Sequence, residues 1–107
     1  MHKKLPTPPQ IKKAFAPLFK KYGVKRAALF GSVSRGEATE KSDIDVLLEF
    51  RGSNKSLLDL VSLEMALQER LGKRVDVVTY ASLHPLLRDR ILKEQKIIYG
   101  KGSPSIS

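Results

Sequence analysis

The sequence predicts one α/β domain in which helices alternate with three or four strands. The length of 107 residues suits a single domain. Apolar residues recur at helical spacing in three segments, residues 8–22, 57–71 and 82–92. Short apolar runs with the length of strands lie between them, at residues 24–30, 43–50 and 75–78. We therefore expect one domain over residues 1–99, followed by a disordered Gly-, Ser- and Pro-rich tail at 100–107.

The first helix is marked at both ends. Thr7, followed by two prolines, is a typical N-cap with proline in the first turn, and Gly23 is a typical C-terminal cap. Pro17 lies inside this segment, where a proline removes a hydrogen bond and costs about 3 kcal/mol, so we expect a kinked or split helix. The apolar stripe consists of Ile11, Phe15, Leu18, Phe19 and Tyr22.

Two strands surround a glycine turn. Residues 24–30 end in four apolar residues, which is typical of a central strand buried on both faces. Gly31 begins a tight turn that we expect to lead into a short helix. In the strand at 43–50, side chains two apart point to the same face, so Asp43 and Asp45 lie together opposite the core. The residues of this strand that we expect in the core are Ile44, Val46 and Leu48.

A further helix, strand and helix complete the domain. Ser56 caps the second helix, and Asp59 completes a capping box. The apolar face of this helix is expected to hold Leu57, Leu60, Leu63, Leu67 and Leu71. The strand at 75–78 directs its first and third residues inward, and the last helix begins at Ser82. The apolar face of that helix is expected to hold Leu83, Leu86, Leu87, Ile91 and Leu92, and residues 97–99 add a short edge strand.

The net charge of +9 is concentrated in the first quarter of the chain. Residues 1–26 hold eight Lys and Arg and no acid, whereas the remaining residues carry a net charge of only +1. Such a segment attracts nucleic acid or an acidic protein. We favour a solvated helix face, and nucleic-acid binding through residues 3–26 stays as the alternative.

The composition excludes several classes of protein. The chain has no cysteine, which excludes disulfides and cysteine-based metal sites. It has no apolar run near the ~18 residues that a membrane span needs, and its first residues lack the apolar run of a secretory signal. We therefore expect a cytoplasmic protein without a membrane segment.

The chemistry is expected at the carboxylates of Asp43 and Asp45. Like charges side by side are costly unless a cation lies between them, and Mg²⁺ prefers carboxylate oxygens together with substrate phosphates. Asp76 is the further strand carboxylate with the right alternation, so it would complete the site and accept the proton of a nucleophile. Two metal ions held by shared carboxylates would stabilise an in-line displacement at phosphorus. The alternative is a set of surface carboxylates on an exposed edge strand.

Gly31 and Ser32 are expected to bind a phosphate beside these carboxylates. A glycine turn at the start of a helix lets a phosphate approach free backbone N–H groups, and the Ser32 hydroxyl can donate to a phosphate oxygen. Arg35 would neutralise the triphosphate or the leaving pyrophosphate. The alternative is a plain corner in which Arg35 pairs with Glu37 or Glu40. Metal and phosphate together indicate a metal–nucleotide site.

The two motifs read Phe30-Gly31-Ser32-x-x-Arg35-Gly36 and Ser42-Asp43-Ile44-Asp45. Together they resemble the signature of the minimal nucleotidyltransferases, a family in the superfamily of DNA polymerase beta, kanamycin nucleotidyltransferase and the CCA-adding enzymes. The resemblance covers residues 10–99 and implies a nucleotidyltransferase fold, with a small mixed sheet of three to four strands flanked by helices. It implies that Gly31 and Ser32 hold the triphosphate of ATP. It also implies that two Mg²⁺ bind at Asp43, Asp45 and Asp76.

The resemblance further implies a role in a toxin–antitoxin system. Small members of this family are often antitoxins encoded beside a HEPN-domain toxin, which is an RNase, and some transfer AMP from ATP to a tyrosine hydroxyl of that toxin. Larger enzymes of the superfamily carry a second domain that binds the acceptor, and a chain of this length is expected to lack it. We therefore expect a HEPN-domain protein as the acceptor, or a homo-oligomer that holds the acceptor. The alternative from another class is a non-catalytic module that neutralises the toxin by contact.

Overall fold

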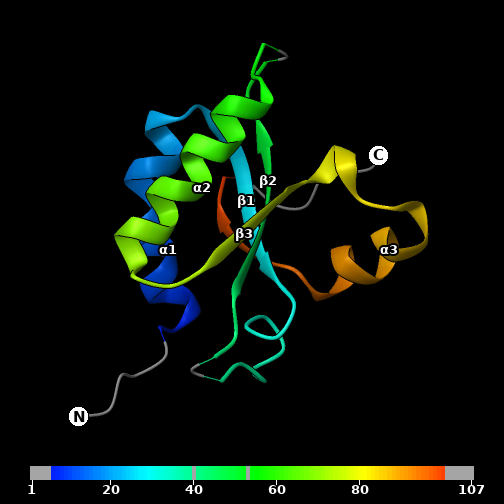
Figure 1. Cartoon of the computed structure of the whole chain (residues 1–107). Coiled ribbons are helices and arrows are strands. Elements are labelled where there is room, and N and C mark those ends of the chain that lie inside the picture. The colour runs from blue at the N-terminus through cyan, green and yellow to red at the C-terminus, as the bar shows by residue number, and fades with distance from the viewer. Residues whose placement is uncertain (1–5, 40, 53, 101–107) are drawn as a thin grey trace.

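The chain folds into a four-stranded sheet with two helices on one face (Figure 1). The computed structural model describes residues 6–39, 41–52 and 54–100. Within them lie α1 (Pro8–Lys21), β1 (Val24–Phe30), β2 (Ile44–Phe50), α2 (Leu57–Leu71), β3 (Val75–Thr79), the short 3₁₀ turn η1 (Tyr80–Ser82), α3 (Pro85–Glu94) and β4 (Lys96–Tyr99). Apart from Gly100, the predicted tail lies outside the described residues.

The sheet is mixed, as the resemblance implies. Its strand order is β3-β2-β1-β4. The strand β1 pairs antiparallel with β2 and β4, whereas β2 and β3 run parallel and are joined through α2. The strand β4 lies at one edge, as predicted for residues 97–99, and β3 lies at the other edge.

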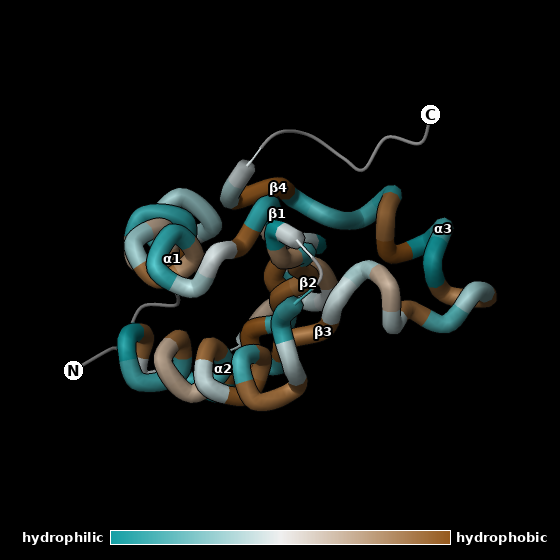
Figure 2. The backbone as a smooth tube through the Cα atoms, turned by 90° about the horizontal axis from the view of Figure 1, so that it is seen from above, coloured by the Kyte–Doolittle hydropathy of each residue, from teal (hydrophilic) through white to brown (hydrophobic). Residues whose placement is uncertain are grey.

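The core lies between the sheet and the pair α1 and α2. Figure 2, seen from above, shows both helices on the same side of the sheet and α3 on the opposite side. The helices contribute Ile11, Phe15, Phe19, Leu63 and Leu67, all fully buried. The strands contribute alternate residues, including the predicted Ile44, Val46 and Leu48 and also Val75 and Val77. This alternation leaves the other face of the sheet for Asp45 and Asp76.

The capping residues behave largely as predicted. The Thr7 hydroxyl accepts a hydrogen bond from the Gln10 amide, and the Gln10 side chain accepts one from the Thr7 amide, which closes a capping box. In the second helix the Asp59 carboxylate accepts a hydrogen bond from the Ser56 amide at 2.8 Å. Of the predicted kink or split at Pro17, the split is wrong, because α1 continues through this residue, which lies on the exposed side.

The apolar faces of α2 and α3 differ from the prediction. Leu57 is 74% exposed, because it lies in the first turn of α2, ahead of the part that packs on the core. The last helix begins at Pro85 rather than Ser82, and His84 caps it by accepting a hydrogen bond from the Leu86 amide. None of the residues of α3 is buried, and Leu86 and Leu87 are largely exposed. A helical stripe predicts a face but not whether the fold supplies a partner for it.

Candidate active site

The predicted site residues meet at the end of the sheet where β1 stops and where β2 and β3 begin. Asp45 stands directly opposite Asp76 in the parallel pairing of β2 with β3. On its other side, Asp45 stands opposite Phe30, the last residue of β1, and the chain turns at Gly31. Two carboxylates and the glycine turn therefore come together from three neighbouring strands.

The carboxylate of Asp45 lies directly against the backbone of Gly31. A Cβ atom on residue 31 would collide with Asp45 Oδ2, and Gly31 has a φ of +73°, which favours glycine. Burial raises the pKa of Asp45 above its usual range, and the charges of Asp76 and Asp43 raise it further, while Arg35 opposes them. A cation bound here would relieve this repulsion.

Asp43 precedes β2 rather than opening it, which corrects the predicted start of the strand. Its side chain is 41% exposed, and its Oδ2 lies 3.9 Å from Nε of Arg74, an exposed residue just before β3. Across residues 6–39, 41–52 and 54–100, no three His, Asp or Glu side chains are gathered closely enough to hold one metal ion. The ligand set therefore needs substrate oxygens, or a rotation of a carboxylate, to be complete.

Residues 31–36 form a series of turns, so the predicted short helix is wrong. The Arg35 amide donates to the Gly31 carbonyl at 3.2 Å, and the Glu37 amide donates to the Ser32 carbonyl at 2.9 Å. The Ser34 hydroxyl also donates to the Gly31 carbonyl, at 2.9 Å. Gly36 has a φ of +73°, which ends any helical run after one turn. An anion at this loop would consequently meet the backbone N–H groups of a single turn, and not the aligned peptide dipoles of a regular helix.

Arg35 is held by two carboxylates. Its Nε donates to Glu37 Oε1 at 2.9 Å, and its Nη1 donates to Glu94 Oε1 at 3.0 Å. These bonds, with Glu37 first, raise the pKa of Arg35. The predicted alternative that Arg35 pairs with Glu37 is thus confirmed for this contact. Glu40, the other predicted partner, lies outside the described residues. Arg35 still lies close enough to Asp45 to lower the pKa of that carboxyl.

Two participants were not found from the sequence. Glu94, at the end of α3, also accepts a hydrogen bond from Arg90 at 3.2 Å, and this contact and the one with Arg35 lower the pKa of Glu94. Arg74 is exposed and lies beside Asp43. The contacts of Glu94 with Arg35 and of Arg74 with Asp43 join chain segments that meet only in the folded state, so no local sequence signal marks them.

The basic residues of the first helix lie away from this site. The lysines at 12, 13, 20 and 21 are exposed on α1, on the helix-covered side of the sheet. In the described parts of the chain, no helix combines the length and the apolar content that crossing a membrane requires.

Sequence comparisons give this arrangement its context. The family described as a nucleotidyltransferase domain matches residues 9–98. A protein of Methanocaldococcus jannaschii, provisionally named a protein adenylyltransferase, is 60% identical over 85 residues, which cover 79% of this chain and 90% of that protein. MntA of Thermococcus cleftensis, named a protein adenylyltransferase, is 42% identical over 77 residues, covering 72% of this chain and 77% of MntA.

Solved structures share the fold. A structure described provisionally as a minimal nucleotidyltransferase superposes with a TM-score of 0.71 at 42% identity and covers 79% of this chain and 86% of that chain. A complex of the tri-AMPylated HEPN toxin of Shewanella oneidensis with its MNT antitoxin gives a TM-score of 0.66 at 20% identity, over 85% of this chain and 71% of that chain. The fold implied by the resemblance is thereby confirmed.

Proposed function

Because the chain belongs to the nucleotidyltransferase domain family, we propose that it transfers AMP from ATP to a hydroxyl group on a protein acceptor, in the cytoplasm and with Mg²⁺. The names of its relatives support AMP as the group and a protein as the acceptor. The observation that carries the proposal is the place of Asp45. Its carboxylate lies between Asp76 and the Gly31 turn, and burial together with the neighbouring acids raises its pKa.

The donor set fits Mg²⁺. Asp43, Asp45 and Asp76 offer carboxylate oxygens from one end of the sheet. The pKa of Asp45 is raised first by burial and then by the charges of Asp76 and Asp43, and a bound cation would offset this repulsion. These residues would hold two ions together with the triphosphate. When bound, Mg²⁺ supplies positive charge that stabilises the charge developing on the phosphate oxygens.

The chain's own residues have separate tasks in this reaction. Gly31 and Ser32 hold the triphosphate of ATP beside the carboxylates, and Arg35 balances the charge of the pyrophosphate that leaves. The acceptor oxygen forms a bond to the α-phosphorus while the bond from the α-phosphorus to the bridging oxygen breaks. Asp76 accepts the proton of the acceptor hydroxyl, and the electron pair of the broken bond leaves with pyrophosphate.

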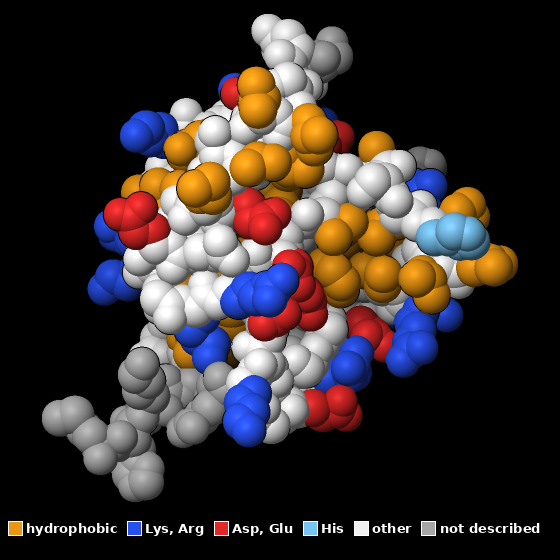
Figure 3. Space-filling view, in the orientation of Figure 1, with side chains coloured by type: hydrophobic (Ala, Val, Ile, Leu, Met, Phe, Trp, Pro, Cys, Tyr) orange, Lys and Arg blue, Asp and Glu red, His pale blue; other side chains and the backbone are white. Residues whose placement is uncertain are grey.

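We further propose that the acceptor is a HEPN-domain toxin and that the chain acts as its antitoxin. The fold is shared with an MNT antitoxin that was solved with a HEPN toxin. The surface offers apolar contacts for a protein partner on two helices, as Figure 3 shows over α2 and along α3. The exposed residues of these two patches are Leu57, Leu58, Val61 and Met65 on α2, and Leu86 and Leu87 on α3.

The decisive experiment incubates the chain with labelled ATP, Mg²⁺ and a HEPN-domain protein from the same organism. We expect label on the partner with the unmodified chain and none with Asp43→Asn or Asp45→Asn. Asp89→Asn, an exposed acid on α3, is the matched control and should retain full transfer. Equal labelling by all variants would contradict the assigned mechanism, and omission of Mg²⁺ should abolish transfer.

A second candidate is neutralisation of the toxin by contact alone. The observation that favours it is the α2 patch, because a row of exposed apolar residues on one helix suits a protein interface. Calorimetry separates the two functions. Tight binding of the partner together with no binding of Mg-ATP would support contact alone, whereas binding of both supports the enzyme.

A further inference from the structure

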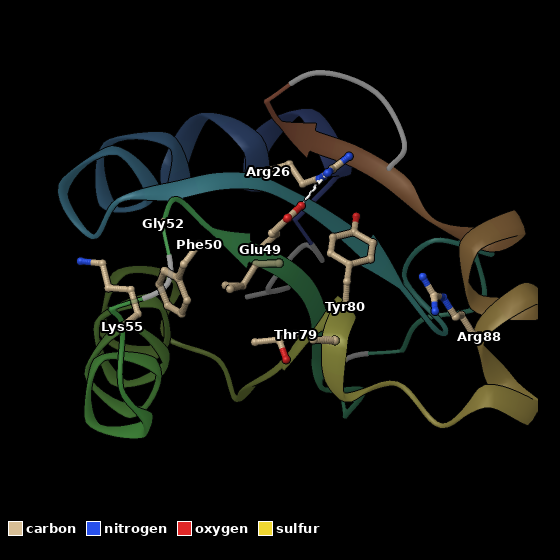
Figure 4. A pocket seen from close by; sticks show the side chains of 10 residues that line it. Arg26, Glu49, Phe50, Gly52, Lys55, Thr79, Tyr80 and Arg88 are labelled. Atoms are coloured by element: carbon tan, nitrogen blue, oxygen red, sulfur yellow. Dashed lines mark hydrogen bonds and ion pairs between the residues drawn. The ribbon is translucent and has the colours of Figure 1, made fainter. Parts of the chain in front are cut away.

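A pocket of about 450 Å³ lies at the other end of the sheet, on the same face as Asp45 and Asp76 (Figure 4). Glu49 and Tyr80, which line it, follow Asp45 and Asp76 by four residues along neighbouring chain segments. Since a strand rises ~3.3 Å per residue, the pocket begins ~13 Å from the catalytic carboxylates. Val78, between Asp76 and Tyr80, is only partly buried.

The centre of the pocket is held by side-chain contacts, and its charge is balanced by one ion pair. Nε of Arg26 donates a hydrogen bond to Glu49 Oε1 at 2.7 Å. The guanidinium of Arg26 also lies over the Tyr80 ring, with its Cζ 5.6 Å from the ring centroid. Tyr80 donates its hydroxyl proton to Gln95 Oε1 at 2.6 Å, and burial raises the pKa of Tyr80 to about 12, so this hydroxyl stays a donor. The Phe50 ring supplies a further apolar wall.

The rim of the pocket carries excess positive charge. Lys55 and Arg88 are exposed, and neither forms an ion pair with the residues that the structure describes. Figure 4 shows them at opposite ends of the pocket. The end of the Lys55 side chain lies against Gly23. A phosphate group binds best where several donors converge on one point. Lys55 and Arg88 are instead separated by apolar walls. This arrangement suits an extended polypeptide whose acidic side chains are spaced along it.

We propose that this pocket binds an acidic segment of the acceptor polypeptide. The inference rests on the proposed function, because it needs a polypeptide acceptor at the carboxylate end of the same face. An extended polypeptide covers ~13 Å in about four residues. An acidic side chain about four residues from the acceptor hydroxyl should therefore enter this pocket, between Lys55 and Arg88.

The test uses the isotope-labelled full chain and two synthetic peptides that each carry one tyrosine. One peptide has glutamate about four residues from the tyrosine, and the other has glutamine there. Amide signals of Thr79 and Ala81 report on the pocket, and those of Gly31 and Ser32 report on Mg-ATP. We expect the glutamate peptide to shift the pocket signals and to bind about tenfold more tightly, which corresponds to ~1.4 kcal/mol.

Two double variants test whether the preference for glutamate comes from the two cations of the pocket or from the net positive charge of the chain. Lys55→Gln with Arg88→Gln should remove the preference for glutamate. Lys12→Gln with Lys20→Gln removes the same charge from the other side of the sheet and should preserve it. Equal affinity for both peptides, loss of preference in both variants, or tighter binding of AMP than of the glutamate peptide at Thr79 and Ala81 would overturn the proposal. Failure of Mg-ATP to shift Gly31 and Ser32 would instead contradict the proposed function.

Discussion

The Asp45 carboxylate packs directly against the backbone of Gly31, so that a Cβ atom on residue 31 would collide with it. Gly36, five residues later, has the same φ of +73° but nothing within 4 Å of a Cβ. Both glycines therefore need a positive φ, but only Gly31 has a side chain, that of Asp45, in the space that a Cβ atom would occupy. This pair separates the backbone strain of a substitution from its effect on the site.

Gly31→Ala should cost more than Gly36→Ala. We expect the free energy of unfolding to fall by about 1 kcal/mol in Gly36→Ala, from left-handed strain alone. In Gly31→Ala it should fall by ~3 kcal/mol, because the new methyl group also displaces the Asp45 carboxylate. Urea denaturation measures both values. AMP transfer should be lost only in Gly31→Ala, and equal loss in both variants would contradict a specific role for the contact.

Asp45→Asn should stabilise the chain near neutral pH while it abolishes transfer. The folded-state pKa of Asp45 lies above its ordinary value, so the folded chain binds this proton more tightly than the unfolded chain. The resulting stability is present below the ordinary aspartate pKa and is lost as the pH rises through the folded-state pKa. Melting temperatures of variant and wild type should thus converge in acid and separate towards neutral pH. Asp89→Asn should follow the wild type throughout.

Arg35→Gln should weaken the binding of Mg-ATP. The guanidinium is the cation that already lowers the pKa of Asp45, and its loss removes a charge-assisted contact with phosphate. We expect KM for ATP to rise about tenfold, with a smaller change in kcat. Glu94→Gln should raise KM in the same direction, because Glu94 holds Arg35 in place. Arg90→Gln, which removes the other partner of Glu94, is the control, and a larger effect there than in Glu94→Gln would contradict the assignment.

Pro17→Ala should stabilise the chain. Pro17 lies inside α1 on its exposed side, where it removes one helical hydrogen bond without a buried contact in return. Replacing it should raise the free energy of unfolding by up to ~3 kcal/mol. Pro9→Ala changes a first-turn position, where proline costs little, and should stay within ~0.5 kcal/mol of the wild type. Chemical denaturation of the two variants gives the comparison.

Local signals predicted the elements, and contacts between distant segments determined the rest. The Thr7 N-cap, the strand at 24–30 and the alternation that leaves Asp45 and Asp76 opposite the core all follow from residues that are neighbours in sequence. The expected helix after Gly31 did not form, because Gly36 and the Ser34 hydroxyl favour successive turns. The contact from Arg35 to Glu94 spans 59 positions, and periodicity cannot reveal such a pair.

The parallel pairing of β2 with β3 determines how the carboxylates of Asp45 and Asp76 lie relative to each other. Asp45 and Asp76 stand directly opposite each other only in the observed register, and side chains change face at every residue of a strand. A slip by one position would bring an apolar neighbour of Asp76 beside Asp45 and direct the Asp76 carboxylate into the core. The register of β2 with β3 therefore sets the distance between the two carboxylates of the proposed site. A change elsewhere in the core that moved this register by one position would disable the site without altering any of its residues.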